Sequence, residues 1–262
     1  MSRPRALILR APGINCERET FDAFERAGAQ SEYLHVKRLV SRPAELERFA
    51  ILAVPGGFAY GDDIAAGRVL AHELRQHAGD QILGFLERGG LVLGICNGFQ
   101  VLVRLGLLPR TGGGPLRQEV TLTHNLSNHY ECRWVTLKTV ASRCTYLPPG
   151  LVLRVPAAHG EGYLACPDER FARLLTDEGY QTFVYVDERG AATTRYPHNP
   201  NGSPHGIAGL TDASGRVLGL MPHPDRAYLG HHMPEWRRDG LAPEGDGMLV
   251  FREMVRAAAG EA

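Results

Sequence analysis

Short apolar runs alternate with segments of helical periodicity along the first hundred residues. Residues 6–9 and 49–54 form continuous apolar runs, and residues 32–39 alternate between apolar and polar side chains. Both patterns predict β-strands. Residues 16–27 and 68–88 instead place apolar side chains three or four positions apart, which predicts helices. Strands that alternate with helices in this order predict a parallel sheet with crossover helices.

The second half of the chain is richer in predicted strands. These strands cover residues 135–138, 151–155, 182–186 and 217–221. Residues 229–245 are polar and rich in His, Pro and Gly, so we expect a long loop there, followed by a terminal helix over residues 247–259. No repeat, low-complexity tract or linker divides the chain, so we predict one domain over residues 1–262. The expected fold is α/β, with a mostly parallel open sheet, flanking helices and a strand-rich second half.

The composition argues against several classes of protein. Lysine plus arginine and aspartate plus glutamate each number 29, so no net charge favours a nucleic-acid or an anionic membrane partner. No apolar run approaches the roughly 20 residues that a membrane-spanning helix needs, and residues 1–5 lead into a strand rather than a signal peptide. The five cysteines show no paired spacing and one is left over, so we expect free thiols in a reducing, cytoplasmic setting.

The most informative segment is an apolar run that ends in Gly-x-Cys-x-Gly. Residues 91–95 predict a buried strand, and the residues after Gly98 predict a helix, so Cys96 lies in a sharp turn between the two. This is the pattern of a nucleophile elbow with sulfur in place of the serine oxygen. At the start of a helix, unpaired N–H groups and the positive end of the helix dipole favour the thiolate, so we predict that Cys96 is a nucleophile. The alternative is a buried structural cysteine, which leaves the flanking glycines unexplained.

A thiolate nucleophile needs a base, and the base needs an orienting partner. His223 follows the buried strand predicted over residues 217–221 and lies between two prolines that fix the backbone. Asp225 lies two residues further on, so both side chains can project from the same extended segment and pair. We therefore predict a catalytic triad of Cys96, His223 and Asp225. Taken alone, His-Pro-Asp also fits a capped turn with an exposed His–Asp pair.

Acyl transfer also needs hydrogen-bond donors for the oxyanion that forms in the transition state. We predict that these donors are the N–H groups of Gly57 and Asn97. Asn97 directly follows the nucleophile, and the Gly56-Gly57 pair lets bare backbone approach a ligand. Gly56 and Gln100 are predicted to contact the substrate, since Gln100 lies on the same face of the elbow helix as Cys96. An ordinary turn between a strand and a loop would explain the two glycines equally well.

Sequence motifs for bound metals and nucleotides are absent. No Gly-x-x-x-x-Gly-Lys-Ser/Thr loop for ATP occurs. The pairs His72/His77 and His231/His232 lack the spacing of a zinc site. We therefore predict that this chain itself binds no metal and no cofactor.

Two motifs together resemble those of the class I, or triad, glutamine amidotransferases. They are Gly-Ile-Cys-Asn-Gly-Phe-Gln at residues 94–100 and Pro-His-Pro-Asp at residues 222–225. Within that class, the chain is similar to the family of glutaminase subunits of phosphoribosylformylglycinamidine synthases. The segments that carry this narrower resemblance are residues 12–17, 55–63, 131–135, 159–162 and 199–203, and together the motifs extend over nearly the whole chain.

The resemblance implies a flavodoxin-like fold and a defined reaction. Cys96 would attack the side-chain amide of L-glutamine to give a glutamyl thioester and ammonia, and His223 would protonate the ammonia and later activate water. Gly57 and Asn97 would hold the oxyanion, and Gln100 would bind the amino-acid portion of glutamine. Ammonia would pass to a large synthetase subunit, which uses ATP and Mg²⁺ to convert formylglycinamide ribonucleotide to its amidine in de novo purine synthesis. A small accessory subunit would belong to the same complex.

One residue departs from the family pattern, which usually ends in His-Pro-Glu. Asp225 is one methylene shorter, and we still assign it the orienting role because aspartate orients histidine in other triads. Three alternatives stay open: an amidotransferase for another acceptor, a cysteine hydrolase that acts unaided, and a flavodoxin-like binding module that keeps the elbow as scaffold. The segment at residues 229–245 is longer than the compact form of the family requires, and a docking role for it is a hypothesis.

Overall fold

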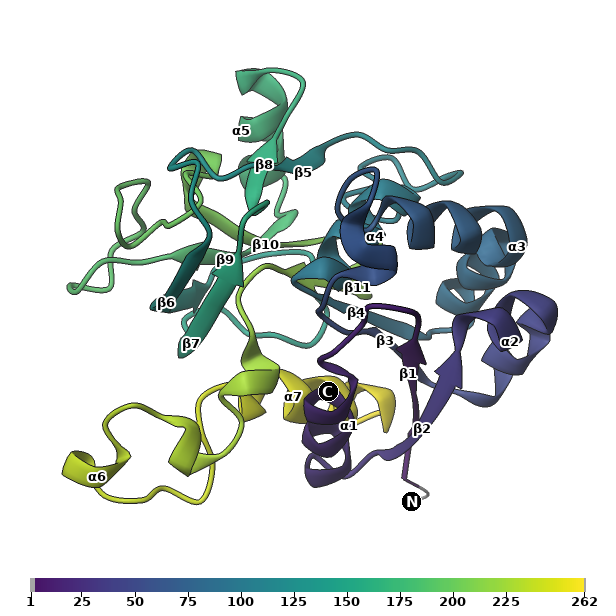
Figure 1. Ribbon diagram of the computed structural model, residues 1–262, viewed down its shortest axis with the longest axis horizontal. Helices are drawn as coiled ribbons and strands as arrows, with labels where there is room; N and C mark the ends of the chain where they lie inside the picture. The colour runs from purple at the N-terminus through teal and green to yellow at the C-terminus, as the bar shows by residue number, and fades with distance from the viewer. Residues whose placement is uncertain (1–2, 262) are drawn as a thin grey trace.

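The structure is a computed structural model that describes residues 3–261. The main feature within these residues is a nine-stranded sheet in the order β2-β1-β3-β4-β11-β10-β9-β6-β7 (Figure 1). Neighbours pair in parallel along one half, formed by β2 (Gln30–His35), β1 (Arg5–Arg10), β3 (Ile51–Val54), β4 (Leu91–Ile95) and β11 (Val217–Leu220). Antiparallel pairs continue the sheet through β10 (Ile207–Thr211), β9 (Gln181–Tyr185), β6 (Glu131–Thr139) and β7 (Val152–His159). A separate pair joins β5 (Thr121–Thr123) to β8 (Tyr163–Ala165).

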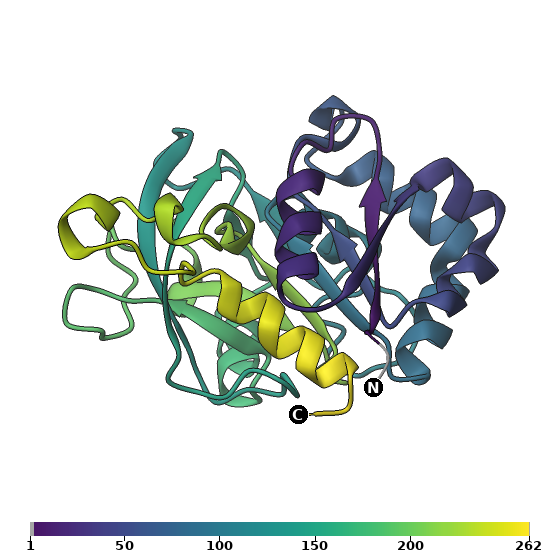
Figure 2. The ribbon, with the colours of Figure 1, turned by 90° about the horizontal axis from the view of Figure 1, so that it is seen from below.

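Helices cover both faces of the parallel half of the sheet. The α-helices are α1 (Glu17–Arg26), α2 (Val36–Ser41), α3 (Arg68–Glu87), α4 (Asn97–Leu105), α5 (Glu169–Asp177), α6 (Trp236–Asp239) and α7 (Met248–Ala258). Short 3₁₀ helices are η1 (Pro43–Arg48), η2 (Ala59–Asp62), η3 (Pro204–Gly206), η4 (Pro224–Arg226) and η5 (Gly230–His232). Figure 1 shows α1 and α7 on one side of the central strands and α3 and α4 on the other, and Figure 2 shows α7 beside α1.

The expected α/β fold, with a largely parallel open sheet and a strand-rich second half, is confirmed. All residues of β3 and β4 are buried, which explains their continuous apolar sequence. β11 comes from the far end of the chain and inserts beside β4, so the parallel half combines the first hundred residues with a late strand. Within residues 3–261, every helix is too short or too polar to cross a membrane.

Two local predictions were wrong. The strand expected over residues 32–39 ends at His35, whose side chain accepts the N–H of Lys37 (3.2 Å) and caps α2. Val36 and Leu39, the buried residues of α2, are three positions apart, which is helical spacing. The long loop expected over residues 229–245 contains η5 and α6, and Figure 1 shows α6 extending away from the sheet.

Candidate active site

The candidate catalytic groups follow the carboxyl ends of three neighbouring parallel strands. Gly56 follows β3, Cys96 directly follows β4, and His223 follows β11. Because the carboxyl ends of parallel strands meet at the same edge of a sheet, these residues lie together despite their separation in sequence. The prediction that Gly56-Gly57 and Cys96 share one edge is confirmed.

The turn at Cys96 is strained in the way the sequence pattern predicts. Cys96 has φ 52° and ψ −108°, a positive φ that a residue with a Cβ adopts at a cost of about 1–3 kcal/mol. A Cβ added to Gly98 would lie 1.8 Å from the carbonyl oxygen of Val54, and one added to Gly94 would lie 2.8 Å from the Gly98 carbonyl carbon. Both glycines are therefore required for α4 to pack directly on the sheet. The N–H of Cys96 donates to Leu220 O at 2.8 Å, which ties the elbow to β11.

The side chains of His223 and Asp225 form a buried pair. His223 Nδ1 lies 3.1 Å from Asp225 Oδ1, and the exposed fractions of the two residues are 1% and 0%. The N–H of His223 donates to Pro156 O on β7 at 2.7 Å, which fixes the backbone. A Cβ added to Gly56 would lie 2.8 Å from His223 Cε1 and 3.5 Å from Cys96 Cβ. The His223 ring and the Cβ of Cys96 therefore lie against the same bare Cα atom.

The electrostatics of this group favour a charged imidazole. Burial by itself disfavours the charged ring, but the negative charge of a Cys96 thiolate and the carboxylate of Asp225 act in the opposite direction. The net result is a pKa of His223 well above its ordinary value. The arrangement therefore favours the protonated form of the His223 ring.

Backbone N–H groups that could bind an oxyanion lie on two sides of the thiol. Gly57 has φ 140°, and a Cβ there would lie 2.7 Å from Gly13 O, so only glycine fits. Asn97 is the first residue of α4, where N–H groups have no partner within the helix. The Asn97 side chain accepts the N–H of Ala59 (2.9 Å) and donates to Asp62 Oδ1 (3.0 Å). The loop after β3 is thereby fastened to the elbow.

Gln100 lies beside the thiol, but its amide is already hydrogen-bonded at both ends. Its Oε1 accepts from Asn97 Nδ2 at 2.9 Å, and its Nε2 donates to Glu161 O at 2.7 Å. In this structure Gln100 therefore connects the elbow helix to the segment that follows β7. The sequence predicts a substrate contact for Gln100 and gives no sign of its hydrogen bond to Glu161.

A cavity of about 140 Å³ lies against Cys96, Gly57 and Gln100, whereas His223 and Asp225 are not among its lining residues. It is lined by Gly57, Phe58, Asp62, Ala66, Cys96, Gln100, Tyr130, Ala158, His159, Gly160 and Glu161. The carbonyl oxygen of Ala158 lies 3.6 Å from Cys96 Sγ, so the end of β7 forms one wall. Burial, together with the nearby charge of His223, lowers the pKa of His159 to about 4. Of these wall residues, His159, Gly160 and Glu161 were singled out only through the family resemblance.

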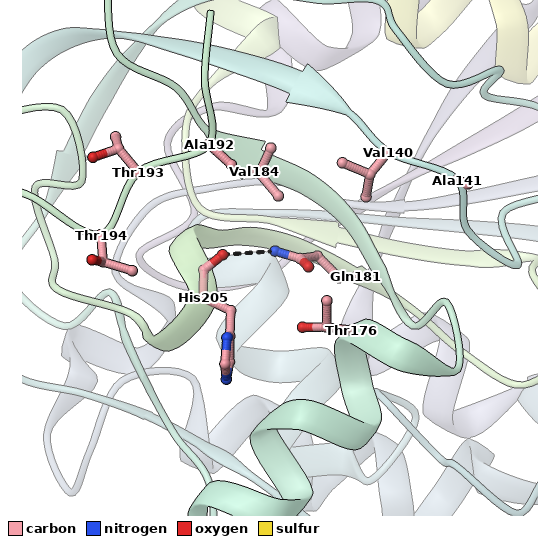
Figure 3. Close-up of a pocket in the computed structure, with 9 residues that line it drawn as sticks. All are labelled: Val140, Ala141, Thr176, Gln181, Val184, Ala192, Thr193, Thr194 and His205. Carbon is pink, nitrogen blue, oxygen red and sulfur yellow. Dashed lines mark hydrogen bonds between the residues drawn. The ribbon is translucent and has the colours of Figure 1, made fainter.

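A larger cavity of about 550 Å³ lies elsewhere and contains none of the candidate catalytic residues (Figure 3). It is lined by Val140, Ala141, Thr176, Gln181, Val184, Ala192, Thr193, Thr194 and His205. Gln181 Nε2 donates to His205 O at 3.1 Å across this cavity. Because none of its lining residues is a candidate catalytic residue, this cavity is not assigned to the reaction at Cys96.

One group of side chains has the composition of a metal site. Potential ligand atoms of Cys16, His223 and Asp225 lie within 4.8 Å of one another. The guanidinium of Arg226, however, donates from Nη2 to Cys16 Sγ at 2.9 Å, and this positive charge opposes a bound cation. Cys16, His223, Asp225 and Arg226 instead form a hydrogen-bonded cluster that includes the imidazole. Sequence reasoning missed the proximity of Cys16, because nothing in its spacing connects it to an elbow so distant in sequence.

Comparison with known proteins identifies the class of protein that this fold and site define. Residues 3–256 match the family model of the CobB/CobQ-like glutamine amidotransferase domain, and the chain belongs to that family. The resemblance to glutamine amidotransferases seen in the sequence is thus confirmed.

Two relatives and one solved structure are more specific. The phosphoribosylformylglycinamidine synthase subunit PurQ of Dehalococcoides mccartyi is 45% identical over 261 residues, 98% of this chain and 99% of that protein. The phosphoribosylformylglycinamidine synthase of Drosophila melanogaster is 37% identical over 239 residues, 88% of this chain but 17% of that protein. The structure of PurLQS from Thermotoga maritima matches with a TM-score of 0.71 at 30% identity, covering 97% of this chain and 99% of the matched chain.

Proposed function

We propose that this chain is the glutaminase subunit of a phosphoribosylformylglycinamidine synthase and hydrolyses L-glutamine to glutamate and ammonia. The observation that carries the proposal is that the side chains of Cys96 and His223 both lie against Gly56, with Asp225 hydrogen-bonded to the ring. The 45% identity to a PurQ subunit over nearly the full length of both chains supports the particular reaction. The proposal treats residues 1–262 as one glutamine amidotransferase domain.

In the proposed mechanism, Cys96 is the nucleophile. Its thiolate attacks the side-chain amide carbon of glutamine, and the N–H groups of Gly57 and Asn97 stabilise the oxyanion that forms. Each such donor contributes roughly 3–4 kcal/mol to transition-state binding. His223, held protonated by its pairing with Asp225, gives its proton to the departing ammonia, and a glutamyl thioester remains on Cys96.

Hydrolysis of the thioester reverses the proton transfer. His223, now neutral, takes a proton from water, and the hydroxide attacks the thioester carbon to release glutamate and the Cys96 thiolate. Asp225 accepts the Nδ1–H throughout and keeps Nε2 available for the reaction. Gly56 leaves room for the ring, and Gln100 together with residues 159–161 forms the wall against the amino-acid portion of glutamine.

The surface around the cavity supports transfer of ammonia to a partner. Phe58 and Tyr130 line the cavity and are 49% and 55% exposed, and Ile64, in the loop after β3, is 67% exposed. Large exposed apolar side chains at the mouth of a site are typical of a docking surface. We propose that it binds the large synthetase subunit, which uses ATP and Mg²⁺, in a complex with a small accessory subunit. The match to the structure of PurLQS from Thermotoga maritima supports this assembly.

Reconstitution of the complex tests the proposal. The purified chain, mixed with the synthetase and accessory subunits, should support glutamine-dependent formation of the amidine from formylglycinamide ribonucleotide. Cys96→Ser should abolish the reaction with glutamine and leave the reaction with added ammonium salt intact. Glutamine hydrolysis without amidine formation would favour another acceptor or an unaided hydrolase, and no hydrolysis in any mixture would favour a binding module.

A further inference from the structure

Cys16 is a fully buried thiol that the proposed mechanism does not use. It lies directly before α1, and its N–H donates to Gly56 O at 3.2 Å. A Cβ added to Gly56 would lie 3.3 Å from Cys16 Sγ, against 2.8 Å from His223 Cε1. The sulfur therefore lies against the same bare Cα atom as the imidazole.

The sulfur of Cys16 makes two hydrogen bonds to groups other than His223, and it also contacts the His223 ring, a contact that raises the pKa of His223. The thiol donates to Asn15 Oδ1 at 3.2 Å, and it accepts from Arg226 Nη2 at 2.9 Å. Arg226 directly follows Asp225 and is partly buried. Among residues 3–261, no carboxylate lies within ion-pair distance of Arg226. The sulfur is thus the group that holds this guanidinium.

Asp225 would be the natural ion-pair partner of Arg226. Its carboxylate is fully buried, with Oδ1 on His223 Nδ1 and Oδ2 3.5 Å from Thr20 Oγ1. Opposite charges in a buried setting attract strongly, and an Arg–carboxylate pair can form two parallel hydrogen bonds. A guanidinium released from Cys16 would therefore compete with the imidazole for Asp225.

We propose that Cys16 is a positioning residue: its sulfur holds the Arg226 guanidinium and thereby leaves the Asp225 carboxylate to His223. This inference rests on the proposed function for its catalytic consequence, but the arrangement itself is a property of the folded chain. The titratable and charged groups around His223 are Asp225 and Arg226 on its own segment, Cys16 before α1, Cys96 at the elbow, His159 at the end of β7 and Tyr130 before β6.

A titration of His223 by NMR with ¹⁵N-labelled histidine tests the inference without any enzyme assay. In Cys16→Ala, Arg226 should draw Asp225 away, and the measured pKa of His223 should fall by about one unit. Cys16→Ser keeps a hydrogen-bond acceptor and should retain the wild-type value. In Cys16→Ala/Arg226→Met the competing guanidinium is gone and only the direct Cys16–His223 contact is missing, so Arg226→Met should raise the pKa of His223 more in the Cys16→Ala chain than in the wild-type chain.

Glutamine hydrolysis by the reconstituted complex supplies the second measurement. Cys16→Ala should lower kcat about 10-fold with little change in KM, and Arg226→Met in the same chain should restore part of it. Cys144→Ala, which removes a buried thiol outside the site, is the matched control and should change neither kcat nor the titration.

The inference is overturned by a wild-type titration in Cys16→Ala, or by an Arg226→Met effect on the His223 pKa that is equal in the Cys16→Ala and wild-type chains, which would indicate that Cys16 acts only by packing or by its direct contact with the ring. If Cys16→Ala fails to fold, Cys16→Val, which fills the space of the thiol without a polar atom, replaces it: an unchanged His223 pKa in Cys16→Val, or one that Arg226→Met raises no more than in the wild type, contradicts the inference. Loss of glutamine hydrolysis in the wild-type complex would refute the proposed function instead, while the titration would still decide the role of Cys16.

Discussion

His223 and Asp225 are two residues apart, and the ring nitrogen Nδ1 lies 3.1 Å from the carboxylate oxygen Oδ1 with both side chains buried. The aspartate therefore reaches the histidine without the extra methylene of the glutamate that usually follows His-Pro in this family. Against the effect of burial, the pKa of His223 is raised first by the negative charge of a Cys96 thiolate and then by the charge and the hydrogen bond of Asp225.

Asp225→Asn removes that charge. Burial and the loss of the carboxylate then both lower the pKa of His223, so the imidazolium is lost at a lower pH. We expect kcat to fall roughly 100-fold or more and the alkaline limb of the pH profile to move to lower pH. Asp225→Glu keeps the charge and is the matched control, with an alkaline limb close to that of the wild type. An unchanged alkaline limb in Asp225→Asn would contradict the orienting role of Asp225.

Gly98→Ala tests the elbow geometry. The added Cβ would lie 1.8 Å from the backbone oxygen of Val54, which cannot move without displacing β3. We expect a loss of at least about 3 kcal/mol in the free energy of unfolding, measured by urea denaturation. At Gly112 no atom lies within 4 Å of an added Cβ, so Gly112→Ala should change stability by less than about 0.5 kcal/mol. Equal stability of the two variants would disagree with the packing described.

The buried His159 should make the free energy of unfolding depend on pH. Its pKa is lowered to about 4 in the fold, against about 6.5 in an unfolded chain. Between these values the unfolded state binds one more proton, so this contribution is complete above pH 6.5 and is lost as the pH falls toward 4. The full loss is about 3 kcal/mol.

His159→Gln should remove this contribution while keeping an amide that can reach Asn125 Oδ1, now 3.1 Å from His159 Nδ1. Urea denaturation at pH 7 and pH 5 measures the effect, with the wild type losing more stability than the variant. Parallel losses in the two proteins would show that His159 titrates normally.

The segment with α6 gives a prediction about assembly. Leu229 and Glu244 form an antiparallel bridge, and a Cβ on Gly230 would lie 1.7 Å from Ala242 O, so the two ends of the segment are closed on each other. Replacing residues 234–240 with a short Gly-Ser linker should therefore change the free energy of unfolding by less than about 1 kcal/mol. If the segment docks a partner, the Kd for the synthetase subunit should rise at least about 10-fold, as measured by calorimetry. An equal Kd for the variant and the wild type would contradict the hypothesis that this segment docks a partner.

The elbow and the strand edge were predictable because their signals are local. Two glycines around Cys96 encode a turn, and a turn after each buried strand places its residues at one edge of a parallel sheet. α5 also has a local signal that was overlooked: Asp168 accepts the N–H of Phe171 at 2.8 Å and caps the helix. β10 has none, because its five residues are all buried and show no alternation.

The surroundings of the triad could not be derived from spacing. Cys16 reaches His223 only because the N–H of Cys16 pairs with Gly56 O, a contact between two loops set by the whole sheet. Likewise, Gln100 is bonded at both ends because the segment after β7 folds over α4. Contacts of this kind depend on tertiary placement, which no periodicity in one sequence records.

The central claim, that Cys96 is the nucleophile toward glutamine, is tested most directly by covalent labelling. The complex with the synthetase subunit would be treated with an electrophilic glutamine analogue, and the adduct located by mass spectrometry of its peptides. The account predicts one adduct, on Cys96, that excess L-glutamine prevents, while the exposed Cys132 stays unmodified. An adduct on another cysteine, or none at all, would contradict it.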